Sequence, residues 1–391
     1  MEHRTADDRF IIELSGRIDS GNSADVEREI NETLESKGDL KLVLDAQELE
    51  YISSAGLRVL LHLRKQHPEL KIINVSTEVY DIFDMTGFNQ MIDIEKAYKV
   101  VDITGCEQIG RGANGAVYRI DGDNVVKVYN DPNAFDEIQN EREVARLALV
   151  LGVPTAISYD IVRVGDGYGS VFEMLDASSF AKILTEQPDK FEWCLDEFTD
   201  MLRIIHSTEV PDGKLPDIRE LMNKRAGIVA GVLPEDKGAK LTKLFEAIPY
   251  DNHMIHGDYH SKNLELTGDE VLLIDMDTLS VGDPIFELGF IYNAFVGFYD
   301  TDHDAVKEFQ GYDYDTSIRF WKEFLPKYLG TDDETRIREV EDRARIVGYT
   351  RLIGRLISRD IVDANKADFD FWTNAINELL ERTDSLCLNG K

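Results

Sequence analysis

Two polar segments in the second half of the chain carry residues that could do chemistry together. Residues 256–263 read His-Gly-Asp-Tyr-His-Ser-Lys-Asn after an apolar pair, and the apolar run 272–274 ends at Asp275. Phosphoryl transfer from ATP needs a carboxylate near the acceptor hydroxyl, and an amide and a second carboxylate to hold magnesium. Asp258, with Asn263 five residues later and Asp275 after a β-type run, fits that need.

The same loop has two alternative interpretations. His253, His256 and His260 with Asp258 could form a metal cluster, but their spacing matches no common zinc signature. Aspartate and asparagine beside a glycine are also ordinary turn formers. The upstream segments decide between these interpretations.

A glycine-rich segment lies upstream of this loop. Residues 109–118 read Ile-Gly-Arg-Gly-Ala-Asn-Gly-Ala-Val-Tyr, with Gly110, Gly112 and Gly115 in a GxGxxG pattern. The next β-type run, 124–129, places Lys127 among apolar neighbours. A glycine hairpin followed by a strand lysine is typical of kinases, whereas a helix follows the glycines directly in dinucleotide-binding folds. We therefore predict a nucleotide site here.

Further residues are expected to complete the nucleotide site. A buried lysine needs a carboxylate partner, because an unpaired ammonium in a core costs several kcal/mol. The predicted helix 135–151 offers Glu143 or Glu141 as that partner, while Glu137 fits a solvated face. The run 169–175 reads as a strand entering a hinge, where backbone groups near Glu173 could bind adenine.

Residues 107 to about 380 resemble the aminoglycoside phosphotransferase and choline-kinase branch of the kinase-like superfamily. The matching motifs are the loop at 256–263, Ile274-Asp275 and Gly282-Asp283-Pro284. The resemblance implies an α+β bilobal kinase-like fold with a helical C-terminal lobe, and it favours Glu143, by its spacing, as the group that orients Lys127. It further implies that Asp258 is the base, that Asn263 and Asp275 bind magnesium, and that Lys127 holds the α- and β-phosphates. His256 is implied to support the loop. Asp277 and Asp283 are each implied to contact a second metal or to be structural, and the structural role is favoured for Asp283.

Two departures from typical protein kinases favour a small acceptor. Gly257 stands where an arginine would receive an activation-loop phosphate, and six residues between Asp275 and Gly282 are too few for a peptide-docking platform. Aromatic and acidic residues alternate in the predicted helices that follow. Such a surface could receive a cationic hydroxyl compound, although aromatic core anchors with an acidic solvated face are the more frequent meaning of the pattern. His206, at the end of another predicted helix, is expected to be a packed structural residue.

The N-terminal part predicts a separate α/β domain. Strand-type and helix-type runs alternate from Phe10 to Ile94, which predicts a mostly parallel sheet covered by helices. In the segment 51–60, Ser53 is expected to cap a helix, and Ser54 lies in its first turn. The segment from Phe10 to Ile94, and above all residues 52–58, resembles the STAS domain of bacterial anti-sigma-factor antagonists. The resemblance implies that Ser54 is a phosphorylation site that controls partner binding, although Ser53 replaces an acidic residue common in that family.

Composition limits the partners. The net charge of −32 is spread along the chain, which disfavours nucleic acid or an anionic membrane as main partner because both bind basic patches. Three scattered cysteines imply no disulfide framework. The sequence has no secretory signal and no apolar run that could cross a membrane, so a cytoplasmic protein is expected.

These observations predict an α/β STAS domain over residues 1–98 and a kinase-like domain over residues 107–391, with lobes at 107–175 and 176–391. The expected activity is Mg-ATP-dependent phosphorylation of a small hydroxyl compound, with the STAS domain as a regulatory or docking module for a protein partner. Two alternatives stay open. In one, the kinase-like part phosphorylates Ser54; in the other, it only binds nucleotide while the STAS domain binds the partner.

Overall fold

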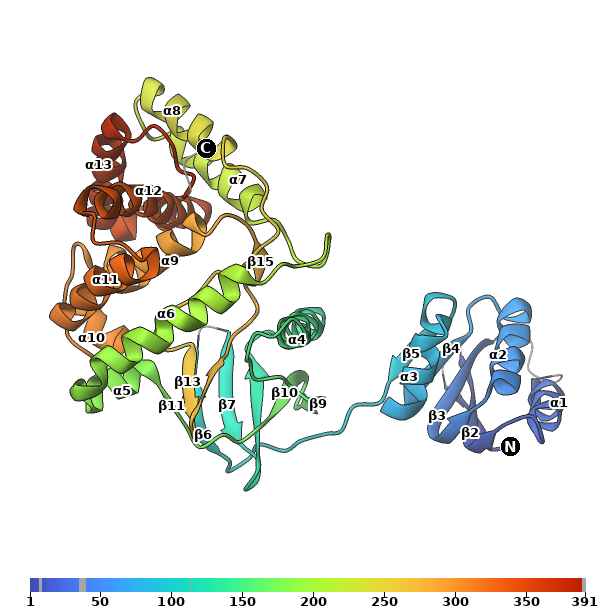
Figure 1. Ribbon diagram of the computed structural model, residues 1–391. Helices are drawn as coiled ribbons and strands as arrows, with labels where there is room; N and C mark the ends of the chain where they lie inside the picture. Colours follow the sequence, from blue (N-terminus) through green and yellow to red (C-terminus); the bar gives the residue numbers. More distant parts are fainter. Residues whose placement is uncertain (7–8, 35–39, 113, 389–391) are drawn as a thin grey trace. The chain divides into compact units, whose positions relative to one another are not determined.

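The computed structural model describes residues 1–6, 9–34, 40–112 and 114–388, so Ala113 of the glycine motif lies outside the described residues. The chain separates into two compact units (Figure 1). The first comprises residues 1–120, 127–132 and 160–170, and the second comprises residues 121–126, 133–159 and 171–391. The two units are described separately below.

The first unit begins with an α/β domain built on a five-stranded sheet of order β1-β2-β3-β4-β5. β1 is antiparallel to β2, and the other neighbours are parallel, which confirms the predicted architecture. Strand β2 continues through Gly16, whose φ of +65° is accommodated by shifts in the pairing of β2 with β3. The elements are β1 (His3–Ala6), β2 (Arg9–Ile18), α1 (Ser23–Leu34), β3 (Lys41–Ile52), α2 (Ser54–Gln66), β4 (Lys71–Val75), α3 (Thr77–Met85), the short helix η1 (Phe88–Gln90) and β5 (Asp93–Lys96).

The start of α2 shows why its two serines differ. Ser53 is the N-cap, and its hydroxyl accepts hydrogen bonds from the backbone N–H groups of Ala55 and Gly56 at 3.2 and 3.5 Å. Gly56 allows a close approach to the sheet, because a Cβ there would lie 2.7 Å from the Ile52 side chain. Ser54 is the first residue of the helix and is exposed. The predicted positions of both serines are confirmed.

The glycine motif forms a β-hairpin, as predicted. β6 (Glu107–Arg111) and β7 (Gly115–Arg119) are antiparallel, and the Gly112 N–H donates to the Gly115 carbonyl at 2.9 Å. A Cβ on Gly115 would lie 2.1 Å from the Val128 carbonyl oxygen, so the hairpin packs closely on the strand that carries Lys127. The sheet has the order β6-β7-β8-β10-β9 and includes β8 (Asn124–Tyr129), β9 (Asp160–Val164) and β10 (Gly167–Glu173).

The second unit is mainly helical and has a large apolar core. Phe198 packs edge-on against Phe295, Phe320 and Phe324, and every residue of α9 is buried. The aromatic residues of these helices therefore serve mostly as core anchors. The elements are α4 (Phe135–Val150), β11 (Ala177–Ser179), α5 (Phe180–Glu186), η2 (Pro188–Lys190), α6 (Phe191–Ser207), α7 (Ile218–Ala230), α8 (Glu235–Glu246), β12 (Met254–Ile255), β13 (Leu264–Thr267), β14 (Glu270–Leu273), β15 (Ser280–Val281), α9 (Ile285–Phe295), η3 (Gly297–Tyr299), α10 (Ala305–Gln310), α11 (Tyr314–Leu329), α12 (Glu334–Ser358), η4 (Asp363–Asn365) and α13 (Lys366–Arg382).

His206 is a structural residue of this core. Its Nδ1 lies 2.8 Å from the Tyr328 hydroxyl, and the two rings meet edge to face. Burial lowers the pKa of His206 to about 3. The histidine is therefore neutral in the folded protein and contributes to the contact between α6 and α11.

The buried His206 makes stability depend on pH. Its folded pKa lies below its ordinary value of 6.5, so the stability it contributes is present above pH 6.5 and is lost as pH falls toward 3. We expect the free energy of unfolding of the wild type to fall, relative to that of His206→Gln, by about 1.4 kcal/mol per pH unit below 6.5. Urea unfolding of both proteins at several pH values measures this difference. A difference that does not change with pH would contradict a buried neutral histidine.

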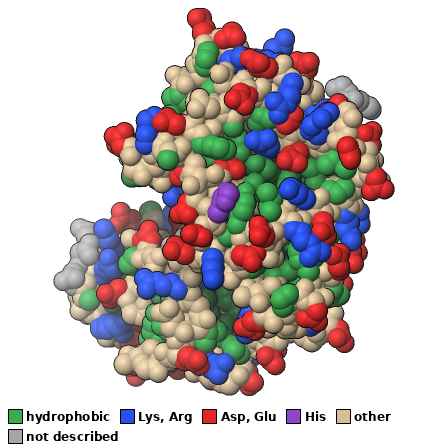
Figure 2. Space-filling view, turned by 90° about the vertical axis from the view of Figure 1, so that its left-hand side faces the viewer, with side chains coloured by type: hydrophobic (Ala, Val, Ile, Leu, Met, Phe, Trp, Pro, Cys, Tyr) green, Lys and Arg blue, Asp and Glu red, His purple; other side chains and the backbone are tan. Residues whose placement is uncertain are grey.

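Charge and cysteines follow the sequence expectations within the described residues. Acidic side chains are scattered among basic ones over the face shown in Figure 2. The three cysteines are free thiols. Among the helices of the described ranges, none is both long enough and apolar enough to cross a membrane.

Candidate active site

A β-hairpin brings Asn263 and Asp275 together. Leu264, which follows Asn263, pairs with Leu273 in the antiparallel pair β13–β14, and the Ile274 N–H donates to the Asn263 carbonyl at 3.0 Å. Asp275 follows directly and has φ +63°, an uncommon left-handed conformation for a residue other than glycine. The amide and the carboxylate therefore leave neighbouring strands at the same end of the hairpin.

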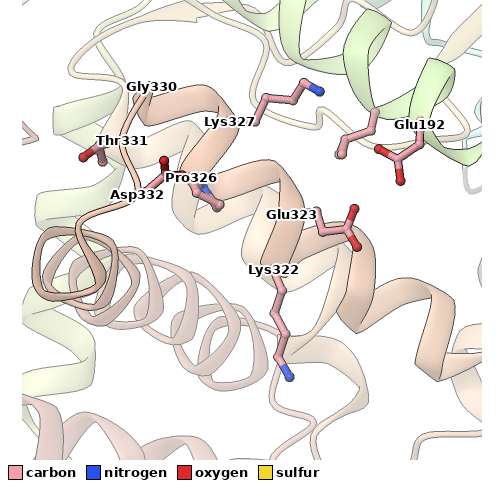
Figure 3. Close-up of a pocket in the computed structure, with 9 residues that line it drawn as sticks. Glu192, Lys322, Glu323, Pro326, Lys327, Gly330, Thr331 and Asp332 are labelled. Atoms are coloured by element: carbon pink, nitrogen blue, oxygen red, sulfur yellow. The ribbon is translucent and has the colours of Figure 1, made fainter.

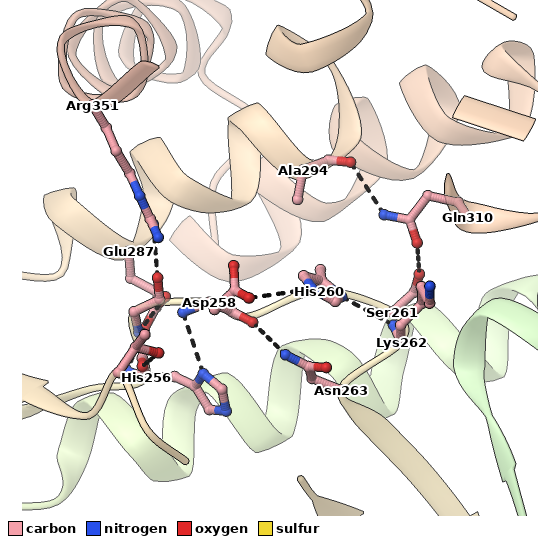
Figure 4. Close-up of polar contacts among 12 residues, drawn as sticks. His256, Asp258, His260, Ser261, Lys262, Asn263, Glu287, Ala294, Gln310 and Arg351 are labelled. Atoms are coloured by element: carbon pink, nitrogen blue, oxygen red, sulfur yellow. Dashed lines mark hydrogen bonds and ion pairs between the residues drawn. The ribbon is translucent and has the colours of Figure 1, made fainter. Parts of the chain in front are cut away.

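The loop between β12 and β13 places Asp258 beside them. β12 and β15 pair at Met254–Val281 and Ile255–Ser280, which fixes the start of the loop. Tyr259 anchors it to α6, because the buried ring packs 4.4 Å from that of Phe198 and its hydroxyl donates to the Phe198 carbonyl at 2.7 Å. The Asn263 side chain closes the loop by donating from Nδ2 to the Asp258 carbonyl at 2.9 Å (Figure 4).

Gly257 has a backbone conformation that favours glycine. Its φ is +86°, and a Cβ there would lie 2.5 Å from the Thr278 carbonyl oxygen. Both the left-handed backbone and the close contact oppose a side chain at this position. An arginine at position 257, where typical protein kinases have one, would therefore not fit this loop.

A buried carboxylate and an arginine hold the loop backbone from the helical side. Glu287 of α9 is fully buried and accepts hydrogen bonds from the N–H groups of His256 at 2.5 Å and Gly257 at 3.1 Å. Burial raises the pKa of Glu287 to about 7 against the effect of these hydrogen bonds. Arg351 of α12 donates to the Gly257 carbonyl at 2.7 Å (Figure 4). Three backbone groups next to Asp258 are thereby fixed.

Asp258 combines accessibility with a stable negative charge. Its side chain is 47% exposed, and Oδ2 lies 3.6 Å from Nε2 of the buried His260. Burial works to raise the pKa of Asp258, but the interactions with His260, Arg351 and His256 outweigh it and lower the pKa to about 2. Asp258 therefore presents an ionised carboxylate that can accept a hydrogen bond from a hydroxyl group near neutral pH.

The orientation of Asn263 suits a magnesium site. Because Nδ2 is used by the Asp258 carbonyl, the amide oxygen is the end available to a cation. Magnesium in phosphate sites is commonly held by one or two protein oxygens together with substrate phosphates and water. The pair Asn263 and Asp275 supplies such a donor set, and the residues present fit the group.

His256 is a buried residue that supports the backbone of the loop. It is fully buried, its Nδ1 accepts from the Asp258 N–H at 3.3 Å, and its carbonyl accepts from the Thr278 hydroxyl at 2.8 Å. Burial lowers its pKa to about 4. Within the described residues, no group of three or more His, Cys, Asp or Glu side chains could hold a metal ion. His256 thus supports the loop, as expected from the sequence.

Asp283 stabilises the start of α9. It is buried, and its Oδ1 accepts from the Ile285 N–H at 2.9 Å. Burial raises its pKa, and this hydrogen bond to the first residue of α9 supports the structural role that the resemblance favoured. Asp277 is exposed, and its role stays a prediction.

The other predicted nucleotide residues are distributed over both units. Gly110, Gly112 and Lys127 lie in the first unit with Gly115, and the Lys127 Nζ is 5.1 Å from the centre of the Tyr129 ring. In the second unit, Glu143 is exposed on α4, Glu141 is half-buried there, and Glu173 is exposed at the end of β10. The pairing of Lys127 with Glu143 or Glu141 stays a prediction.

Sequence reasoning missed Glu287 and Arg351. Glu287 had a usable signal, because it is a single carboxylate in a segment of α9 that is otherwise almost entirely apolar. Arg351 had none, since it lies 94 residues from the carbonyl that it contacts.

A surface pocket elsewhere, between α6 and α11, includes no residue of the loop at 256–263 (Figure 3). Its lining residues are Glu192, Leu195, Lys322, Glu323, Pro326, Lys327, Gly330, Thr331 and Asp332.

The fold and this site define a phosphotransferase-type protein with an added α/β domain. The chain belongs to the phosphotransferase enzyme family, whose model matches residues 105–322. The STAS domain model matches residues 1–102, so the chain combines an N-terminal STAS domain with a kinase-like fold. This confirms the predicted combination and fold class.

Individual relatives agree with the STAS match. A putative anti-sigma factor antagonist BtrV of Bordetella bronchiseptica is 37% identical over 86 residues, which are 21% of this chain and 73% of that protein. An anti-sigma-B factor antagonist of Listeria monocytogenes is 29% identical over 92 residues, which are 22% of this chain and 80% of that protein.

Solved structures also resemble the chain at low identity. A thermostable mutant of aminoglycoside phosphotransferase APH(4)-Ia in its apo form has 13% identity and a TM-score of 0.47, with 71% of this chain and 94% of that chain covered. A choline/ethanolamine kinase family protein from Mesorhizobium loti has 18% identity and a TM-score of 0.43, and the match covers 71% of this chain and 88% of that protein's chain.

Proposed function

We propose that the protein transfers the γ-phosphoryl group of ATP to a hydroxyl group of a small molecule, with the STAS domain as a regulatory or docking module. The observation that carries this proposal is the arrangement of Asp258, Asn263 and Asp275 around one rigid hairpin and loop. Membership of the phosphotransferase family supports it. The absence of an arginine at Gly257 and the short segment after Asp275 favour a small acceptor.

The chain's own residues would do the following in this reaction. Asp258 accepts a hydrogen bond from the acceptor hydroxyl, orients its oxygen toward the γ-phosphorus and takes its proton as the new P–O bond forms. The bond from the γ-phosphorus to the bridging oxygen breaks, and ADP leaves with that electron pair. Glu287 and Arg351 hold the loop backbone, so Asp258 is positioned before the acceptor arrives.

Asn263 and Asp275 would hold magnesium, and Lys127 would hold the α- and β-phosphates beneath the glycine hairpin. Magnesium, when bound, neutralises the phosphate charge that develops during transfer. The hairpin of Gly110, Gly112 and Gly115 would cover the phosphates, backbone groups near Glu173 would hydrogen-bond adenine, and Glu143 would orient Lys127.

Acceptor-dependent ATP consumption tests the proposal. The full chain is incubated with Mg-ATP, with and without the small-molecule fraction of a bacterial extract, and ADP is measured. We expect ADP formation to depend on the extract and on magnesium. Equal ADP levels with and without the extract would contradict transfer to a small acceptor.

A second candidate function is phosphorylation of Ser54 by the chain's own kinase-like domain. The observation that favours it is the exposed Ser54 at the start of α2, where Ser53 and not Ser54 makes the capping hydrogen bonds. A phosphate there would lie at the positive end of the helix dipole and would add negative charge to an exposed position.

The intact mass of the protein after incubation with Mg-ATP distinguishes the two candidates. With a small acceptor as substrate, we expect no gain in mass, because the phosphoryl group leaves with the product. A gain of one phosphate that maps to Ser54, and that is absent in both Asp258→Asn and Ser54→Ala, would favour the second candidate instead.

A further inference from the structure

A stripe of arginines runs along the C-terminal half of α12. Arg351, Arg355 and Arg359 follow at intervals of four residues, the last one directly after the helix end. Residues four apart lie on the same face of a helix, so the three guanidinium groups share one side. Arg355 and Arg359 are exposed, and Arg351 is half-buried.

A fourth arginine joins this stripe from α7. Arg225 packs its aliphatic stem against Gly354 of α12, where a Cβ would lie only 3.1 Å from Arg225 Cγ. The glycine therefore leaves space for the arginine between the two helices. Burial and, to a smaller extent, the positive charges of Arg351, Arg355 and Arg359 lower the pKa of Arg225 to about 10. We call these four residues the arginine cluster.

The guanidinium groups of the arginine cluster form no ion pair with a carboxylate of the described residues. Within the described ranges, no carboxylate oxygen lies within 4.0 Å of any of its four guanidinium groups, although the chain has 75 acidic residues. Arg351 instead donates to the Gly257 carbonyl and lies 3.9 Å from the centre of the Phe290 ring. Gathering four like charges is unfavourable unless an anion compensates them.

The arginine cluster borders the catalytic aspartate. Burial lowers the pKa of Arg351 and of Arg355, and the negative charge of Asp258 partly opposes this effect. Both guanidinium groups therefore interact electrostatically with the Asp258 carboxylate. Figure 4 shows Arg351 reaching from α12 to the loop that carries Asp258. An anion held by Arg225 and Arg355 would therefore lie next to the acceptor position.

We propose that the phosphoryl acceptor carries an anionic group, a carboxylate or a phosphate, in addition to its hydroxyl, and that Arg225 and Arg355 hold this group beside Asp258. This inference rests on the proposed phosphotransfer and specifies its substrate class. Guanidinium groups suit both anions, because their planar N–H donors match two oxygens at once. The cluster disfavours the cationic hydroxyl compound that the sequence pattern left open.

Anion binding by the full chain tests the inference without knowledge of the acceptor. The protein is saturated with magnesium and the ATP analogue AMP-PNP, so that the nucleotide site is occupied, and is titrated by calorimetry with inorganic phosphate, acetate or ethanolamine. We expect an anion to bind and ethanolamine not to bind. Tighter binding of phosphate indicates a phosphate-bearing acceptor, and tighter binding of acetate indicates a carboxylate-bearing one.

Variants locate the anion. Arg225→Gln and Arg355→Gln should each weaken binding of the preferred anion at least tenfold. Arg338→Gln is the matched control, because Arg338 is an exposed arginine of the same helix about 20 Å from Arg351 along its axis, and it should bind as the wild type does. The inference is overturned if neither anion binds, if ethanolamine binds more tightly, or if the two test variants bind like the wild type.

The result of the anion titrations can be told apart from a failure of the proposed function. Failure of AMP-PNP to bind would contradict the phosphotransferase activity alone. The same titrations would then be made on nucleotide-free protein, where the comparison of Arg355→Gln with Arg338→Gln still reports on the arginine cluster.

Discussion

Asp258→Asn should lower the turnover number by about 10²–10⁴-fold and leave nucleotide affinity unchanged. The amide has nearly the same shape as the carboxylate, so the hydrogen bond from Asn263 to the backbone carbonyl of residue 258 should persist. The amide oxygen can still accept a hydrogen bond, but it cannot take the hydroxyl proton or supply negative charge. ADP release measures turnover, and calorimetry with Mg-AMP-PNP measures nucleotide affinity.

Asp269→Asn is a suitable control for this prediction. Asp269 is exposed in the turn between β13 and β14, at the far end of the hairpin from Asn263 and Asp275. The substitution removes the same charge from the same hairpin and should leave turnover unchanged. Full activity of Asp258→Asn, or an equal loss in both variants, would remove Asp258 from the reaction.

Glu287→Ala should destabilise the kinase-like domain by roughly 3–5 kcal/mol. The substitution leaves the buried N–H groups of His256 and Gly257 without an acceptor and takes a neighbouring negative charge away from Arg351. It also opens space in a helix whose residues are all buried. The shift in the urea midpoint for unfolding of this domain measures the effect.

Glu287→Gln separates the hydrogen bonds from the charge. Its amide oxygen can still accept from both N–H groups, so the loss of stability should be clearly smaller than in the alanine variant. Turnover should fall less in Glu287→Gln than in Glu287→Ala, because the loop that carries Asp258 keeps its hydrogen bonds, and nucleotide affinity should stay the same. Equal stability of the wild type and Glu287→Ala would contradict the role of Glu287 in holding the loop.

Local spacing in the sequence was sufficient to predict much of the fold and the core of the candidate site. The interval from Asp258 to Asn263 predicted a loop, and the β-type run before Asp275 predicted a strand. In the structure, the pairing of β13 with β14 brings Asn263 and Asp275 together. In the same way, Ser53 was predicted as a helix cap from its position before an apolar periodic run. Such predictions succeed because the interactions involved are local in sequence.

Long-range interactions could not be predicted from spacing. Glu287 contacts backbone groups 30 and 31 residues away, and Arg351 contacts one 94 residues away, so no periodic pattern links them to the loop. The arginine cluster also depends on the packing of α7 against α12, which only a folded structure shows. Lys127 and Glu143 lie in different units of the structure, and their pairing stays a prediction.

The destination of the γ-phosphoryl group is the most direct test of the proposed phosphotransfer. The full chain is incubated with magnesium, γ-³²P-labelled ATP and the small-molecule fraction of a bacterial extract, and the label is separated into ATP, inorganic phosphate, protein and other small molecules. We predict that label leaves ATP and enters a small molecule, and that this transfer is lost in Asp258→Asn. Label that stays in ATP, or that appears only in protein or inorganic phosphate, would contradict the proposal.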